Sequence, residues 1–229
     1  MTALAFALAA AFVRLGEWQW DKGMMRQAQW DAFARGADHP VPLARQSLEA
    51  LPRFQRVEVR GNLDGTHQFL LDNRTYSGRA GYEILTPLAL EDGRTLLVDR
   101  GWVPFTGSRA RLPEVSVVPQ PQLSLTGRID LLPAGGLAMG RAPPPPGVSW
   151  PKVTSYPDMD QLSSALGRKL EPRLLLLDRG APLGYVRDWQ PPGLPPARHW
   201  SYAIQWWGLA ATLIVIWAVL STRKTEAPA

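Results

Sequence analysis

Three histidines are the side chains of this sequence best suited to ligate a metal or move a proton, because the chain contains no cysteine. His39 lies in a proline-rich turn and His67 in a predicted turn before a strand, where both are expected to be exposed. His199 differs, because Tyr202 and Trp206 follow it at helical spacing on one face. One interpretation is that His199 only anchors a helix at a membrane boundary. The other is that it ligates a metal-bearing cofactor, since imidazole is a common axial ligand of haem iron.

Other kinds of catalytic chemistry find little support in the sequence. It has no Gly-x-Ser-x-Gly elbow, no His-Glu-x-x-His or His-x-His pair, and no glycine-rich phosphate loop after a strand. The formal net charge of +5 is scattered, and no Lys/Arg cluster is interleaved with aromatic residues. The sequence therefore predicts no nucleic-acid partner, and it ranks an enzyme, such as a membrane-anchored hydrolase, below a binding protein.

The element that must position His199 is the apolar stretch that follows it. No charged residue occurs from Tyr202 to Leu220, and at 1.5 Å per residue this stretch covers about 28 Å, close to the thickness of a bilayer's hydrocarbon core. Aromatic residues, which favour the headgroup level, gather at its start: Trp200, Tyr202, Trp206 and Trp207. We predict a C-terminal transmembrane helix over residues 199–221, followed by the basic residues Arg223 and Lys224.

A second apolar run occupies Thr2 to Val13. A cleaved signal peptide is the alternative, but no basic segment precedes the run and the sequence from Arg14 to Trp18 does not resemble a cleavage site. We predict an N-terminal transmembrane helix at residues 1–20, whose true start is expected to precede the first residue of this sequence.

Between these two segments, residues 21–196 are predicted to form a β-rich domain with a helical entry segment that ends near residue 35. The 22 prolines and 20 glycines favour turns and short strands. Apolar patterns predict strands at 57–59, 69–71, 82–85, 88–90, 95–98, 123–129 and 174–177. Asp92-Gly93 suits a primed hairpin turn, Asp158 caps a short helix that ends before Gly167, and residues 133–151 form an exposed proline-rich loop. The predicted fold class is a membrane protein of α+β type, with two transmembrane helices flanking an antiparallel domain.

Three predicted strand ends carry an acidic residue followed by arginine, at 71–74, 98–101 and 177–180. One interpretation is three surface ion pairs of small energetic value. The other is that some of these arginines, Arg100 among them, face a common anionic ligand. Gly101 stands between Arg100 and a bulky Trp102, a setting that predicts a positive φ angle or a close backbone approach.

Several of these segments together resemble one protein family. The opening Leu15-Gly16-Glu17-Trp18-Gln19, with Lys22 and Arg26 after it, the stretches 81–88 and 97–104, and the closing 199–207 are similar to signatures of the Surfeit locus protein one (SURF1-like) family. The similarity covers both apolar segments and most of the domain, in the same order. Two departures are the exchange of Arg and Lys at positions 22 and 26, and Asp99 where the family usually has Asn.

The resemblance implies a non-enzymatic assembly factor, or chaperone, of haem-copper cytochrome c oxidase in the respiratory chain, which helps haem a reach subunit I. The implied partners are subunit I, other oxidase assembly factors or haem a synthase, and membrane lipid. His199 is then the expected axial ligand, with Tyr202 and Trp206 flanking the macrocycle. Arg198 is expected to pair with the propionates, and Arg100 and Arg179 from the domain are further candidates for that role. The alternative is a membrane-anchored scaffold that stabilises oxidase subunits without binding haem.

The expected location is the inner membrane of a bacterium. Arg223 and Lys224 place the C-terminus in the cytoplasm by the positive-inside rule. Two spans then place both termini in the cytoplasm and the main domain in the periplasm.

Overall fold

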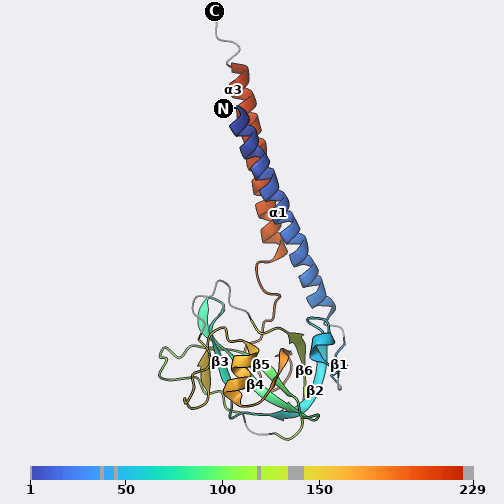
Figure 1. Ribbon diagram of the computed structural model, residues 1–229, viewed down its shortest axis with the longest axis vertical. Helices are drawn as coiled ribbons and strands as arrows, with labels where there is room; N and C mark the ends of the chain where they lie inside the picture. Colours follow the sequence, from blue (N-terminus) through green and yellow to red (C-terminus); the bar gives the residue numbers. More distant parts are fainter. Residues whose placement is uncertain (1, 37–38, 44–45, 118–119, 134–141, 224–229) are drawn as a thin grey trace, which may run out of the picture. The chain divides into compact units, whose positions relative to one another are not determined.

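The computed structural model describes residues 2–36, 39–43, 46–117, 120–133 and 142–223 (Figure 1). The chain forms two compact units. The first, here called the helical unit, comprises residues 1–32 and 190–229; the second, the β domain, comprises residues 33–189.

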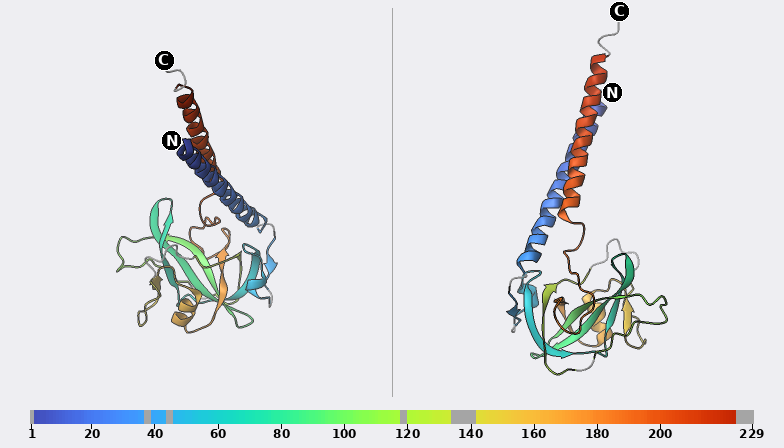
Figure 2. Two further views of the ribbon diagram at one scale, coloured as in Figure 1. Left: turned by 45° about the horizontal axis from the view of Figure 1, so that its top comes forward. Right: turned by 180° about the vertical axis from the view of Figure 1, so that it is seen from behind.

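Two long helices make up most of the helical unit. Helix α1 runs from Thr2 to Arg35 and helix α3 from Pro196 to Arg223, and the two lie side by side in every view (Figures 1 and 2). The separate segments predicted at 1–20 and 21–35 are therefore one continuous helix. Gly16 and Gly23 do not break it, because each is a single helical glycine rather than part of a turn.

Among the described residues, one helix segment is long and apolar enough to cross a membrane, Pro196–Thr222, with a mean hydropathy of 1.8. The predicted N-terminal span over residues 1–20 does not meet the same criterion of length and mean hydropathy. Arg14 and Glu17, which form an exposed ion pair of 2.8 Å, interrupt its apolar run. By length and composition, therefore, α3 contains the one candidate membrane span among the described residues, and α1 lies beside it.

The two helices approach each other through glycines on α1 and tryptophans on α3. The buried residues of α1 are Ala9, Gly16 and Gly23, spaced by seven. A Cβ atom added at Gly16 would lie 2.3 Å from Nε1 of Trp207, and one added at Gly23 would lie 2.4 Å from Nε1 of Trp200. Each indole ring therefore occupies the space that a side chain would fill, as a knob fills a hole in a coiled coil.

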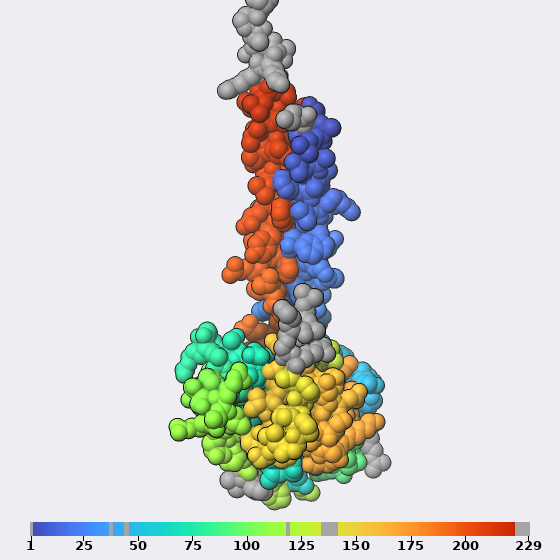
Figure 3. Space-filling model, turned by 60° about the vertical axis from the view of Figure 1, so that its left-hand side comes forward, coloured from blue at the N-terminus to red at the C-terminus, as the bar shows by residue number. Residues whose placement is uncertain are grey.

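Aromatic contacts continue this packing along the helices. Phe6 meets the Trp217 ring edge-on at 4.9 Å between centroids, and Phe12 stacks on Trp206 at 5.6 Å. Partner numbers rise on one helix as they fall on the other, so the helices are antiparallel. Figure 3 shows the two helices in contact along their length.

The β domain is built on one curved sheet. Its strands are β1 (Val41–Pro42), β2 (Arg56–Leu63), β3 (Phe69–Tyr76), β4 (Arg79–Leu90), β5 (Thr95–Pro104), β6 (Leu123–Asp130), β7 (Lys152–Thr154) and β8 (Leu170–Leu177). The order β2-β6-β8-β5-β4 closes on itself through a β2–β4 pairing, which makes a five-stranded barrel. All pairs around this barrel are antiparallel except β5 with β8, so the predicted antiparallel sheet holds with one exception within the barrel. Strands β3, β7 and β1 extend the sheet at its two ends, where β1 and β7 pair in parallel with their neighbours.

The predicted strands all fall within observed ones, but the two predicted at 82–85 and 88–90 are parts of the single strand β4. Strands β1 and β7 were not predicted. Helix α2 (Met159–Leu166) also matches its prediction, with a capping box at Asp158 and a left-handed Gly167 after its end. The predicted primed turn is wrong. Gly93 has a positive φ of 87° but Asp92 does not, whereas a type I′ turn needs both. Of the predicted loop 133–151, residues 134–141 lie outside the described part of the chain.

The close approach of α1 and α3 generates a prediction. Gly16→Ala and Gly23→Ala each add about 1 kcal/mol of helix propensity, yet we expect both to push the helices apart, because the new methyl group meets an indole ring. Gly208→Ala is the matched control, since nothing lies within 4 Å of its Cβ position.

The measurement is the distance between spin labels on Leu15→Cys and Leu209→Cys, two exposed positions in a chain free of cysteine. We expect a longer or broader distance distribution for the Gly16 and Gly23 variants only. An unchanged distribution in both would contradict the packing described above.

Candidate functional site

The predicted site residues divide between the two units. His199, Tyr202 and Trp206 lie on α3 in the helical unit, whereas Arg100 lies on β5 in the β domain. The structure adds one residue that the sequence reasoning missed, Gln19 on α1. A signal for it was present: Gln19 follows Phe12 by seven residues, just as His199 precedes Trp206 by seven.

His199 lies half-buried in the first turns of α3. Its Nδ1 atom is 2.8 Å from the side-chain oxygen of Gln19. Among the described residues, this is the hydrogen bond that the imidazole ring makes, and it joins α1 to α3. The imidazole is therefore held by its neighbour helix at one nitrogen while Nε2 has no protein partner in the described chain.

Tyr202 and Trp206 share a face of α3 with His199 but differ in their surroundings. Tyr202 is 40% exposed. Trp206 stacks against Phe12 with an angle of 30° between the ring planes, so one face of its indole is already covered. Tyr202 is thus free to contact a ligand with its ring, and Trp206 offers only the face or edge turned away from α1.

These residues fit a haem with one axial protein ligand. A neutral imidazole with a free Nε2 is the donor that haem iron takes from histidine. Two residues beyond Trp206, Gly208 has open space at its Cβ position, and Arg198 is an exposed cation beside His199. No group of three or more His, Asp or Glu residues in the described chain is placed to hold a free metal ion.

Arg100 serves the interior of the β domain. The residue is 3% exposed. Its Nε donates to the carbonyl of Leu183 at 2.7 Å, and one terminal nitrogen donates to the side-chain oxygen of Gln68 at 2.8 Å and to the carbonyl of Val115 at 3.2 Å. The guanidinium also lies over the ring of Tyr185, 4.8 Å from its centroid.

Burial lowers the pKa of Arg100, and the nearby Tyr185 opposes that shift. The hydrogen-bond partners of Arg100 are neutral oxygens rather than a carboxylate. Such a buried cation is tolerated only when its donors are bonded. We interpret Arg100 as a structural residue that ties β5 to three other segments of the domain.

The other two strand-end arginines have their own acidic partners. Arg74 pairs with Glu83 at 2.7 Å, and Arg179 pairs with Asp188 in an exposed ion pair. The three arginines therefore have separate partners. For Arg74 and Arg179, the structure supports the interpretation as ion pairs at or near the surface.

Asp99, next to Arg100 in sequence, is a buried acid of the β domain. The residue is 1% exposed, and its carboxyl accepts a hydrogen bond of 3.0 Å from the backbone N–H of Gly101. Burial raises the pKa of Asp99 well above its ordinary value, the negative charge of Glu83 raises it further, and the Gly101 N–H and Arg74 act against the shift. Burial therefore favours the protonated form of the Asp99 carboxyl.

Gly101 confirms the expectation of a positive φ angle, with φ at +107°. A Cβ at this position would lie 2.5 Å from the carbonyl oxygen of Val186 and 2.7 Å from Cγ of Arg187. Both the backbone angle and the space therefore require glycine.

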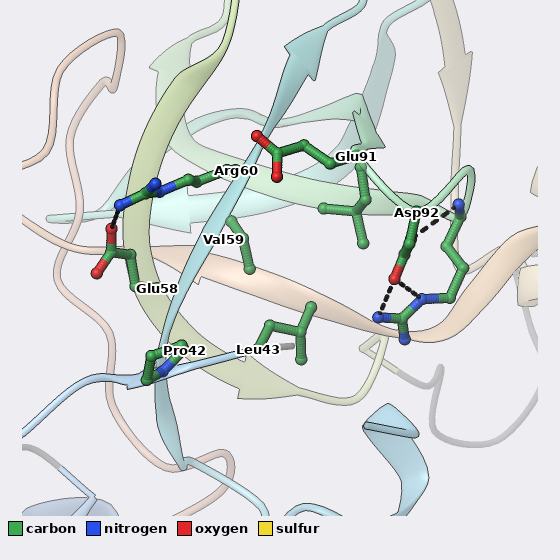
Figure 4. Close-up of a pocket in the computed structure, with 9 residues that line it drawn as sticks. Pro42, Leu43, Glu58, Val59, Arg60, Glu91 and Asp92 are labelled. Carbon is green, nitrogen blue, oxygen red and sulfur yellow. Dashed lines mark hydrogen bonds and ion pairs between the residues drawn. The ribbon is translucent and has the colours of Figure 1, made fainter. Parts of the chain in front are cut away.

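A groove of the β domain lies away from all of these residues. It has a volume of about 700 Å³ and lies where β1 and β2 face the turn between β4 and β5 (Figure 4). Its rim is charged, with Glu58 bonded to Arg60 and Asp92 bonded to Arg94. None of the predicted site residues lines this groove, and its open, charged walls do not suit an apolar macrocycle.

Comparisons with known proteins identify the family. The SURF1 family profile matches residues 6–211, so the chain belongs to the SURF1 family, as the resemblance indicated. A SURF1-like protein of Dictyostelium discoideum is 28% identical over 103 residues, 38% of this chain and 37% of that protein. An uncharacterized SURF1-like protein of Mycobacterium bovis and one of Mycobacterium tuberculosis are each 30% identical over 138 residues, 56% of this chain and 50% of theirs. The matched regions span half the length, or less, of these curated relatives.

The buried Asp99 generates a prediction of pH dependence. Its folded pKa is raised, so between the unfolded pKa of about 3.9 and the raised folded value the folded state binds more protons than the unfolded state. The free energy of unfolding therefore falls as pH rises through this range. We expect Asp99→Asn to remove this loss and to be more stable than the wild type at pH 8.

The control is Asp92→Asn, because hydrogen bonding to Arg94 lowers the pKa of Asp92. The ionised Asp92 adds to the free energy of unfolding at neutral pH, and this contribution is lost as pH falls, so its pH dependence has the opposite sign to that of Asp99. Urea unfolding of the variants at pH 5 and pH 8 tests Asp99, and unfolding at pH 3 tests Asp92, because its contribution changes only below the unfolded pKa of about 3.9. A wild type and an Asp99→Asn variant with the same pH dependence would show that Asp99 is ionised in the folded protein.

Proposed function

We propose that this protein is a membrane-anchored, non-enzymatic assembly factor for haem-copper cytochrome c oxidase that assists the delivery of haem a to subunit I. Membership of the SURF1 family supports the link to oxidase assembly. The observation that carries the haem role is the imidazole of His199, held at Nδ1 by α1 and free of protein partners at Nε2 within the described chain.

In this proposal His199 holds the haem iron from the first turns of α3. When bound, the haem supplies an iron centre that accepts one axial nitrogen from the protein. Tyr202 covers part of the macrocycle with its exposed ring, and Arg198 pairs with a propionate. A single protein ligand suits a carrier, because it leaves the cofactor easy to pass to a site with more ligands.

Arg100 has no direct part in this proposal. Its donors are bonded to oxygens inside the β domain, so a propionate would have to displace those bonds. Of the arginines expected to pair with the propionates, Arg198 keeps that role in this proposal, because it is exposed beside His199.

The partners in this proposal meet the protein through its apolar helices. Large apolar side chains of α3 are exposed along its length: Ile204, Leu209, Val215, Ile216, Val219 and Leu220. They suit lipid and transmembrane helices of the oxidase, of other assembly factors or of haem a synthase.

We also propose that both helices cross the bacterial inner membrane. Phe6 contacts Trp217 and Phe12 contacts Trp206, so the first turns of α1 accompany the apolar part of α3. The Arg14–Glu17 ion pair lowers the cost of placing charge near the membrane boundary. Both termini are then cytoplasmic and the β domain is periplasmic.

The haem role predicts a spectral change in variants of His199. The full chain is purified from a strain that makes haem a, and its visible spectrum is compared with those of His199→Ala and His199→Met at matched abundance. We expect His199→Ala to lose most of the Soret absorbance and His199→Met to shift the bands, because the axial ligand is removed or replaced.

His67→Ala serves as the control, since His67 belongs to the β domain and its Nδ1 bonds to Asp64 at 2.9 Å. It is expected to keep the wild-type spectrum. If both His199 variants keep that spectrum as well, the haem role is wrong, and the scaffold that binds oxidase subunits without haem takes its place.

The two-span topology predicts the side of each end of the chain. A fluorescent reporter that folds only in the cytoplasm should be active when fused after Ala229, and alkaline phosphatase fused there should be inactive. Val148→Cys, which is exposed in the β domain, should react with a membrane-impermeant maleimide added to cells with a permeabilised outer membrane. Active phosphatase at the C-terminus, or an unreactive Val148→Cys, would contradict the topology.

A further inference from the structure

The contact between Gln19 and His199 is a polar pair in an otherwise aromatic seam. One heptad toward the N-terminus of α1, the equivalent positions hold the stacked rings of Phe12 and Trp206. At the next position the Gln19 oxygen meets His199 Nδ1 at 2.8 Å. A second aromatic stack would hold the helices together as well, so packing alone does not explain why an amide and an imidazole occupy this level.

The glycines on either side of Gln19 fix how far its side chain must reach. Gly16 and Gly23 lie one turn before and one turn after it, and each accepts an indole ring against its backbone. The indole rings of Trp207 and Trp200 therefore lie against the backbone of α1 on both sides of Gln19, and they limit the space open to its side chain. Such rigid placement is what a supporting residue needs to fix the orientation of a metal ligand.

The contact between Nδ1 of His199 and the side-chain oxygen of Gln19 indicates which ring nitrogen carries the proton. The amide oxygen of Gln19 only accepts hydrogen bonds, so Nδ1 must donate. A neutral imidazole with its proton on Nδ1 has a bare lone pair on Nε2. Histidines that ligate metals commonly donate their other N–H to an oxygen in this way, which fixes the tautomer and the ring plane.

We propose that Gln19 is a positioning residue, which holds His199 in the Nδ1–H tautomer and presents Nε2 as the ligand for haem iron. The proposal rests on the haem role described above and assigns part of that role to α1. It makes the ligand a product of both helices, so that α3 alone would present a histidine with no fixed tautomer or orientation.

The first test uses the full chain without haem, in detergent micelles. Nitrogen-15 NMR of the labelled imidazoles at a pH where histidine is neutral distinguishes the two tautomers, and comparison with His199→Ala identifies the signals among the three histidines. We expect His199 of the wild type to carry its proton on Nδ1. We expect Gln19→Leu to give a mixture of tautomers and Gln19→Glu, which keeps an acceptor oxygen, to keep the Nδ1–H form.

The matched control is Gln27→Leu, because Gln27 also lies on α1 but donates to Asp31 of the same helix at 2.8 Å. It is expected to leave the tautomer of His199 unchanged. A wild-type His199 protonated on Nε2 would overturn the proposal, because the Gln19 amide group would then donate rather than accept. An unchanged tautomer in Gln19→Leu would overturn it as well.

The second test measures haem binding by the same variants. Loss of a supporting residue typically costs 10- to 100-fold in affinity for the metal group, so we expect a loss of about that size for Gln19→Leu and none for Gln27→Leu. A changed tautomer with unchanged haem affinity would overturn the positioning role. Haem binding that survives His199→Ala would refute the proposed function instead, while the NMR result would still establish whether the Gln19–His199 hydrogen bond exists.

Discussion

The helical unit depends on the absence of two Cβ atoms. At Gly16 and Gly23 the indole rings of Trp207 and Trp200 lie where a side chain would begin. Helix association in a membrane has little hydrophobic driving force, and close van der Waals packing against small residues takes its place. Here the small residues are on one helix and the largest are on the other. The close approach brings Gln19 within hydrogen-bond distance of His199.

The β domain depends on a different kind of constraint, which is a buried cation. Arg100 places its donors on oxygens from Gln68, Val115 and Leu183, three segments that are distant in sequence. The neighbouring Asp99 points to the other face of β5, and burial raises the pKa of its carboxyl above the ordinary value. The two adjacent ionisable side chains therefore lie in different surroundings, because successive side chains of a strand point to opposite faces of the sheet.

The predicted site residues are divided between the helical unit and the β domain. The groups that we propose to bind haem, His199 and its neighbours, are all in the helical unit. One arginine expected to assist them, Arg100, is instead a structural part of the barrel. This division separates the effects of substitutions: changes at Arg100, Asp99 or Gly101 act on the stability of the β domain, and changes at Gln19 or His199 act on the site itself.

The sequence by itself determined the elements whose formation is local. The apolar length of α3, the alternation in the strands, and the cap and stop of α2 at Asp158 and Gly167 all follow from short-range rules, and the structure contains each of them. His199 could also be singled out, because its place before an apolar helix is visible in the sequence. The role of Arg100 could not, since an Asp-Arg-Gly strand end gives no sign of whether its arginine faces water or the core.

Only the tertiary structure decided that Arg100 is buried, that β2 closes on β4, and that Gln19 meets His199 across 180 residues. Each of these depends on contacts between distant segments, and such contacts are set by packing that no local pattern encodes.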